Sequence, residues 1–263
     1  MAQSKYEYVR QFEMDDTALP QCFIVVRIDG RCFHQFADLH NFTKPSDDRA
    51  LHLMNAAAAE VMTQYRDIFI GYGQSDEYSF ILQPSAKLFK RRQSKIATTI
   101  VSLFSAAYVA SWNKYFDYPM QSIPSFDSRC ILYPSYQTMR DYLSWRQVDC
   151  HINNLYNYCF WKLVDANEVN GGLDPKTAEN FLSTTVSADK NELLFSKFGI
   201  NYNNLPLLHR KGTVLFWQQQ LLEVPGKVTP QGEVVKRWKP VLQVKHCDLI
   251  RDDFWEKNDI KFV

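Results

Sequence analysis

The chain has almost no net charge, and it lacks the short glycine-rich motifs that most often mark a nucleotide-binding protein. Its 30 Lys and Arg side chains nearly balance 29 Asp and Glu side chains, for a formal net charge of +1. A global basic field is therefore excluded, and any contact with nucleic acid must come from a local patch. No G-x-x-x-x-G-K-[ST] or G-x-G-x-x-G sequence occurs, so neither a P-loop nor a dinucleotide-binding loop is predicted.

Paired cysteines and long apolar runs are also missing. The six cysteines form no C-x-x-C pair, which predicts reduced thiols in a reducing compartment. A zinc site at Cys150–His151 or His246–Cys247 is not favoured, because each lacks a second ligand pair. The acidic first residues predict no signal or transit peptide, and no apolar run approaches membrane-spanning length. We therefore expect a soluble cytoplasmic protein without membrane contacts, and leave nuclear and mitochondrial distribution open.

What is present is the composition and element order of a folded α+β protein. The 263 residues are 46% hydrophobic and 14% aromatic, enough for one large domain or a domain with an addition. Residues 1–134 predict the order β-α-β-β-α-β, which is typical of the ferredoxin-like split βαβ unit. Its elements are expected at 22–29, 49–65, 67–82 (a hairpin), 86–116 and 126–133.

Residues 135–263 predict an α-rich addition that contains a β-hairpin. A long helix is expected to end near Val164, and hairpin strands are expected at 212–217 and 233–238. Two local predictions concern the first half. Residues 34–44 are expected to be irregular, and the turn of the first hairpin is expected at 71–75.

Three carboxylates lie where neighbouring strands of this fold should meet. Asp29 and Gly30 end the first strand, and Asp76 and Glu77 begin the second strand of the hairpin. In the ferredoxin-like order these strands are adjacent and antiparallel, so the acids should share one edge of the sheet. Such a pair can hold two divalent cations about 3.5–4 Å apart for phosphoryl transfer, and magnesium suits oxygen ligands. For Asp29 alone, ordinary turn chemistry is an equally good explanation.

Two further groups of polar residues have a structural and a functional explanation. Arg146, Asp149, Asn153 and Asn157 fall on one stripe of the long helix, where a hydrogen-bonded helix interface is favoured over a ligand site. The basic stretch that ends at Lys95 is favoured as a solvated helix face. Lys95, Lys44 and Arg27 are nevertheless candidates for contacting nucleotide phosphates.

Several long motifs resemble those of the eukaryotic histidine-tRNA guanylyltransferases. The matching stretches are IDGRCFHQF, GYGQSDEYSF, DCHINNLYN, ADKNE, INYNNLP and RKGT, and the resemblance extends over essentially the whole chain. It implies a polymerase-palm catalytic domain that adds a guanylate to the 5′ end of histidine tRNA, in the 3′–5′ direction. It also implies ATP-dependent adenylylation of the tRNA 5′-phosphate, attack by the 3′-hydroxyl of GTP and removal of pyrophosphate.

The resemblance also implies roles for individual residues. Asp29 and Asp76 would ligate two magnesium ions, assisted by Gly30, with Glu77 as a neighbouring acid and Lys95 as a catalytic cation. A further set would contact ATP or GTP: Asp29, Gly30, Arg31, Cys32, Phe33, His34, Lys44, Ser75, Asp76, Lys95 and Asn157. Histidine tRNA would be contacted by His151, Asn153, Lys190 and Asn201, and the enzyme would be a homotetramer. A palm-fold nucleotide cyclase and a non-catalytic RNA-binding module are the alternatives.

Overall fold

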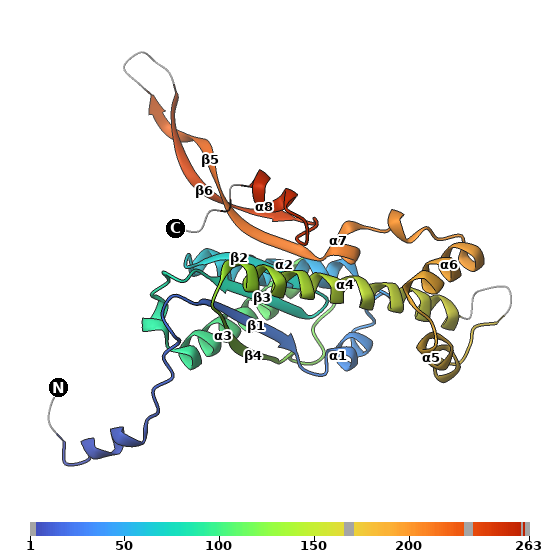
Figure 1. Cartoon of the computed structure of the whole chain (residues 1–263), viewed down its shortest axis with the longest axis horizontal. Coiled ribbons are helices and arrows are strands. Elements are labelled where there is room, and N and C mark those ends of the chain that lie inside the picture. The colour runs from blue at the N-terminus through green and yellow to red at the C-terminus, as the bar shows by residue number, and fades with distance from the viewer. Residues whose placement is uncertain (1–3, 166–170, 229–233, 259, 261–263) are drawn as a thin grey trace.

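The structure, a computed structural model, describes residues 4–165, 171–228, 234–258 and 260. Its centre is one antiparallel sheet with the strand order β4-β1-β3-β2-β5-β6 (Figure 1). The strands are β1 (Phe23–Gly30), β2 (Ile68–Gln74), β3 (Glu77–Leu82), β4 (Phe126–Tyr133), β5 (Thr213–Val228) and β6 (Val234–Lys245). The first four strands have the order expected for the ferredoxin-like unit, so the predicted α+β fold is confirmed.

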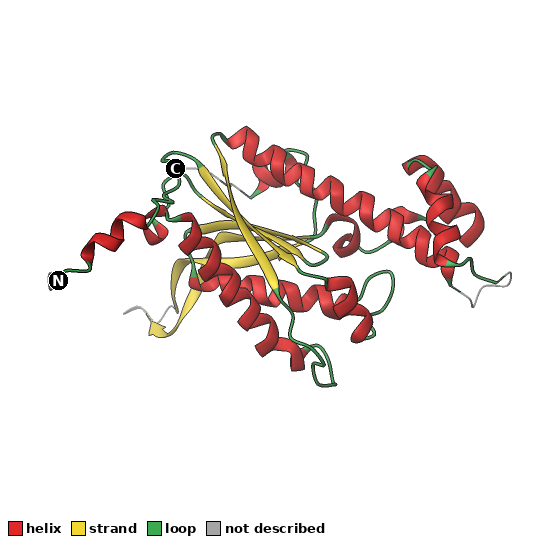
Figure 2. Cartoon of the chain, turned by 90° about the horizontal axis from the view of Figure 1, so that it is seen from below, coloured by secondary structure: helices red, strands yellow, loops and turns green. Residues whose placement is uncertain are grey.

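Helices cover both faces of the sheet because its central strands are apolar on both sides. Along β1, Val26 and Ile28 point into one core with α2 (Asp48–Gln64) and α3 (Gln93–Ser111). Val25, on the opposite face, points into a second core with α4 (Tyr136–Val164). This alternation follows from the period of two along a strand. The long helix α4 crosses the sheet and extends well beyond it (Figure 2).

The second half adds helices at the far end of α4 and two strands to the sheet. The helices α5 (Pro175–Ser183) and α6 (Ser187–Phe198) pack on α4 around Leu155 and Cys159. Residues 213–216 of β5 pair with β2, and the rest of the β5–β6 hairpin projects from the body (Figure 1). The short helices are α1 (Phe33–Leu39), α7 (Leu207–Lys211), α8 (Asp253–Lys257) and the 3-10 turns η1 (Glu7–Phe12), η2 (Leu88–Arg91), η3 (Trp112–Lys114) and η4 (Tyr202–Asn204).

Two local predictions are wrong, and both errors arise from tertiary packing. Residues 33–39 form α1 because Phe36 is buried in the core, where its ring centroid lies 6.3 Å from that of Tyr108 and 5.9 Å from that of Trp112. Gly73 lies inside β2 rather than in the turn. A Cβ there would lie 2.1 Å from the Tyr78 ring, so this glycine is needed for close approach. The two turn residues are Ser75 and Asp76.

Both strands of the second hairpin are longer than predicted, and residue 233, at the start of the predicted partner strand, lies outside the described residues. The sequence predicted no apolar run of membrane-spanning length, but one helical stretch meets that criterion. The stretch Gln93–Lys114 is long and apolar enough, by length and composition, to cross a membrane. However, Ile96, Ile100 and Phe104 pack in the core under the sheet, as in a core helix of a globular protein.

Candidate active site

The three predicted carboxylates lie at the same end of the β1–β3 strand pair and line one cavity. Asp29 is the direct cross-strand partner of Glu77, so their side chains point to the same face of the sheet. The Gly30 N–H donates to the Asp76 carbonyl at 3.2 Å, which fixes the turn against the end of β1. Ser75 has a φ of +49° and its hydroxyl donates to the Asp76 carboxylate at 3.0 Å. The predicted acidic edge is therefore present.

Gly30 allows the Asp76 carboxylate to approach the backbone of β1. A Cβ at this position would lie 2.8 Å from Asp76 Oδ2 and 2.5 Å from the Phe33 ring. Any larger residue would therefore have to displace the carboxylate, the ring or the strand end.

Burial and like charge together disfavour ionisation at this edge. Burial raises the pKa of the Asp76 carboxyl to about 6, and the neighbouring charges of Asp29 and Glu77 add to that rise. Burial also raises the pKa of Glu77, which the Arg146 guanidinium opposes. Arg146 Nη1 donates to Glu77 Oε2 at 2.8 Å, and Nη2 lies 3.2 Å from Asp149 Oδ2. The acidic edge is thus only partly balanced, because Arg146 of α4 and Arg27 of β1 offset the charge of several carboxylates.

A cavity of about 1030 Å³ opens from this edge, between the sheet, α2 and α4. It brings together eleven of the predicted site residues: Asp29, Gly30, Cys32, Phe33, His34, Lys44, Ser75, Asp76, Glu77, Asn153 and Asn157. Arg146 and Asp149 line it too, so the polar stripe of α4 faces a cavity instead of a helix interface. The stripe is nevertheless hydrogen-bonded, because Asn153 and Gln74 both donate to Asp149, at 3.1 and 3.0 Å.

Lys44 is the predicted cation that the fold places in this cavity. Its ammonium pairs with Asp38 at 2.6 Å and lies 5.1 Å from the centroid of the Trp161 ring. With Tyr156 and Phe160, Trp161 adds aromatic rings to the lining of the cavity. An acidic edge, a cation and aromatic rings around one cavity are features that suit a nucleoside triphosphate.

Arg27 and five of the site residues that the resemblance implies lie outside this cavity. Arg31 is exposed, and its N–H donates to the Ser125 carbonyl. Lys95 is exposed near the start of α3, whereas Tyr108 of the same helix contacts Phe33 at a centroid distance of 6.0 Å. At about 1.5 Å per helical residue, Lys95 lies about 20 Å from that contact. The structure therefore does not bring Lys95 to this cavity, and its catalytic role stays a prediction.

The other three are predicted tRNA contacts that have structural partners. The Lys190 ammonium is half-buried and donates to the carbonyls of Leu182 and Thr185 and to the Thr185 hydroxyl, at 2.7–3.3 Å. All three of its protons are used at the end of α5, so it is not free to bind phosphate. His151 Nδ1 lies 3.1 Å from the Tyr202 hydroxyl. Asn201 begins η4 and accepts the Asn203 N–H.

His209 also lines the cavity, although no sequence motif predicted it. Its ring hydrogen-bonds the Tyr158 hydroxyl at 2.8 Å and the Asp48 carboxylate at 2.5 Å. It thereby joins α7, α4 and α2, elements that are distant in the chain, and only the docked helices bring these groups together.

The donor set fits magnesium with substrate phosphates as additional ligands. The Asp29 and Asp76 carboxylates supply oxygen ligands, and their mutual repulsion would be relieved by a divalent cation. Glu77 Oε1 is buried and, among the described residues, has no hydrogen-bond partner. No three His, Cys, Asp or Glu side chains in the described part of the chain converge on one point. Magnesium commonly completes its coordination with water and phosphate oxygens.

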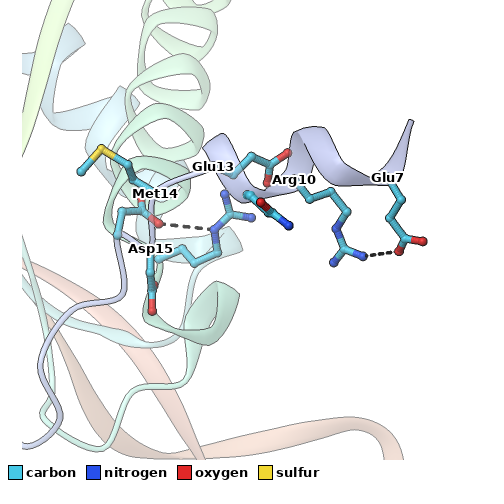
Figure 3. A pocket seen from close by; sticks show the side chains of 8 residues that line it. Glu7, Arg10, Glu13, Met14 and Asp15 are labelled. Atoms are coloured by element: carbon cyan, nitrogen blue, oxygen red, sulfur yellow. Dashed lines mark hydrogen bonds and ion pairs between the residues drawn. The ribbon is translucent and has the colours of Figure 1, made fainter. Parts of the chain in front are cut away.

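A second, shallower hollow of about 500 Å³ lies by the N-terminal turn η1 (Figure 3). Arg10 pairs there with Glu7 at 3.0 Å, and Arg92 pairs with Asp16 at 3.4 Å. These pairs are largely exposed, and none of the predicted site residues lines this hollow.

Comparison with known proteins decides the family. The model of the tRNAHis guanylyltransferase family matches residues 6–134, and that of the Thg1 C terminal domain matches residues 137–251. The chain belongs to the tRNA(His) guanylyltransferase family. A Bos taurus protein named probable tRNA(His) guanylyltransferase is 52% identical over 98% of this chain and 88% of its own length. A Schizosaccharomyces pombe tRNA(His) guanylyltransferase is 50% identical over 97% of this chain and 96% of its own length.

Solved structures of this family have the same architecture. The crystal structure of the Saccharomyces cerevisiae tRNA(His) guanylyltransferase is 51% identical, with a TM-score of 0.75, over 81% of this chain and 93% of that chain. A bacterial Thg1-like protein in complex with ATP is 20% identical, with a TM-score of 0.72, over 97% of this chain and 98% of that chain. At that identity the bacterial structure shows the fold alone.

Proposed function

We propose that this chain adds a guanylate to the 5′ end of histidine tRNA in the 3′–5′ direction. The observation that carries the proposal is the meeting of Asp29 and Asp76 at one end of a cavity of about 1030 Å³. Membership of the tRNA(His) guanylyltransferase family supports the substrate. Relatives that share half of their residues over nearly the whole chain carry that name.

The reaction has three proposed stages. The 5′-phosphate of the tRNA attacks the α-phosphorus of ATP and releases pyrophosphate, which leaves an adenylylated 5′ end. The 3′-hydroxyl of GTP then attacks the 5′-phosphorus, loses its proton and displaces AMP. Hydrolysis finally removes pyrophosphate from the new 5′-triphosphate end.

Asp29 and Asp76, with the Gly30 carbonyl, would hold two magnesium ions at the acidic edge. When bound, these ions lower the pKa of an attacking hydroxyl and neutralise charge on the leaving phosphate. The chain itself positions the nucleotide. Lys44 provides a positive charge for the phosphates, and the amide side chains of α4 provide hydrogen bonds. Binding to tRNA, a tetrameric assembly and a cytoplasmic location are part of this proposal.

The test is a 5′-addition assay with purified protein, magnesium, ATP and labelled GTP. We expect label on 5′-monophosphorylated histidine tRNA and none on a phenylalanine tRNA control. Asp29→Ala should abolish labelling while keeping the unfolding midpoint of the wild type. Consumption of GTP without RNA labelling would contradict the proposal and indicate a cyclase. Tight tRNA binding without turnover would contradict it and indicate a binding module.

A further inference from the structure

An exposed apolar stripe runs along α4 beside the catalytic cavity. Trp145, Val148 and Ile152 are 56%, 41% and 50% exposed, and their spacing of three and four residues puts them on one side of the helix. The adjoining side of α4 carries Arg146 and Asn153, which line the cavity. The stripe therefore lies along the outside of the wall that encloses the catalytic site.

The indole of Trp145 is held in place although it is exposed. The Arg146 guanidinium lies 3.8 Å from its ring centroid, and that guanidinium is itself fixed by Glu77 at 2.8 Å. The Tyr142 ring meets the indole at a centroid distance of 6.2 Å, and its hydroxyl is fixed by Ser79 at 2.6 Å. A rigid, exposed aromatic ring loses little conformational entropy when another ring stacks on it.

Two further arginines lie on the face of the sheet that α4 covers. Arg27 on β1 is the cross-strand partner of both Arg129 on β4 and Ser79 on β3, the residue that holds Tyr142. Arg27 Nε is buried and has no hydrogen-bond partner among the described residues. Arg129 is more than half exposed, and its carboxylate partner Asp127 lies 3.5 Å away. Aromatic platforms beside backbone-binding cations are typical of surfaces that bind single-stranded nucleic acid.

We propose that Trp145 stacks against the 5′-terminal nucleobase of the RNA substrate, with Arg27 and Arg129 facing the adjoining phosphates. The inference rests on the proposed function, because the RNA 5′ end has to reach the acids, and Trp145 stacks on Arg146, which lines their cavity. A second copy of the chain is the less suitable occupant. A two-fold contact centred on the same patch would bring the arginine pairs of both copies together.

The first measurement uses the wild-type protein and two RNAs. Dissociation constants are compared for 5′-monophosphorylated histidine tRNA and for the same RNA without its 5′-terminal base. Loss of one stacked base should weaken binding by roughly 5- to 140-fold, which is the range for one base on one aromatic ring. Equal affinity for the two RNAs would overturn the proposal. Labelling of the intact RNA by the wild type tests the proposed function separately.

The second measurement uses protein variants. Trp145→Ala should weaken binding of intact RNA by a similar factor, and Trp145→Phe should stay within a few-fold of the wild type. Removal of the base should cause no further loss in Trp145→Ala. Trp238→Ala, which removes another exposed indole from the projecting hairpin, is the matched control and should bind like the wild type. Unchanged GTP affinity in Trp145→Ala would show that Arg146 and Glu77 are still in place.

Two results with the variants would overturn the proposal. One is RNA affinity in Trp145→Ala equal to that of Trp238→Ala. The other is a change of oligomeric state in Trp145→Ala, measured by light scattering, together with base removal that still weakens its binding. That second result would identify the stripe as a contact between copies of the chain.

Discussion

Replacing Arg146 with Met should strongly destabilise the protein, because it leaves the Glu77 carboxylate without its cation. The two side chains are only 8% and 11% exposed, and the ion pair is 2.8 Å long. Removing one partner of a buried pair typically costs about 3–5 kcal/mol, because the other charge stays buried. Here the penalty is reinforced, since Asp29 also raises the pKa of Glu77. We therefore expect a loss near the upper part of that range.

The assay is urea unfolding of the metal-free protein at pH 7.5, followed by both circular dichroism and tryptophan fluorescence. The matched control is the double variant Arg146→Met with Glu77→Gln, in which the uncompensated charge is gone. It should recover a large part of the lost free energy of unfolding. The two single variants and the double variant form a cycle, whose expected coupling energy is about 1–3 kcal/mol for residues in direct contact.

Two results would refute the reasoning. The first is a loss of less than about 1 kcal/mol in Arg146→Met, which is the cost of an exposed pair. The second is a double variant no more stable than the single variant. Either would mean that water, and not Arg146, balances the charge of Glu77.

Two further predictions concern Asp76 and Lys190. Burial raises the pKa of Asp76 from 3.8 to about 6, so the folded protein binds this proton more tightly than the unfolded chain, and stability is lost as pH rises to about 6. The side chain of Asp76→Asn cannot ionise, so the metal-free variant should gain up to about 3 kcal/mol in free energy of unfolding at pH 8 and little at pH 4, because one unit of pKa shift corresponds to about 1.4 kcal/mol. Urea unfolding at the two pH values measures this gain, and an equal gain at both would contradict the prediction. Lys190→Met should lose about 2 kcal/mol of stability, because three hydrogen bonds of a charged donor disappear, and should keep its RNA affinity. Weaker RNA binding with an unchanged unfolding midpoint would restore Lys190 as a tRNA contact.

The parts of the fold that depend on local pattern could be predicted from the sequence. β4 was predicted with its observed bounds, because its apolar run ends at Pro134, and α4 ends at the predicted Val164. The order of elements then placed β1 beside β3, which is the step that brought Asp29 to Glu77. Gly73 could not be interpreted in this way. A glycine suits a turn and a close contact equally, and only the Tyr78 ring decides between them.

In the candidate site, too, the features that depend on local sequence were predicted, and those that depend on helix docking were not. Residues that are neighbours in sequence, such as Ser75 and Asp76, were predicted together and lie together in the cavity. The α4 stripe was recognised from helical spacing, but its environment depends on how α4 docks. Lys190 matched a family motif, yet its three protons are used within the chain by groups at the end of α5. A motif can identify a residue, but only the folded structure shows whether the hydrogen-bond donors of that residue are free to bind a ligand.

The dependence of the acids on α4 limits what either half of the chain can do alone. The carboxylates belong to the first half, whereas Arg146, the stronger of the two cations that oppose the pKa rise of Glu77, comes from α4 in the second half. The other cation, Arg27, is on β1. The Asp149 carboxylate continues this connection, because it accepts a hydrogen bond from Gln74 on β2. Without α4, only Arg27 would offset the repulsion among the carboxylates at the end of this buried strand pair. The α-rich half therefore completes the charge balance of the acidic edge, whatever surface it also provides for RNA.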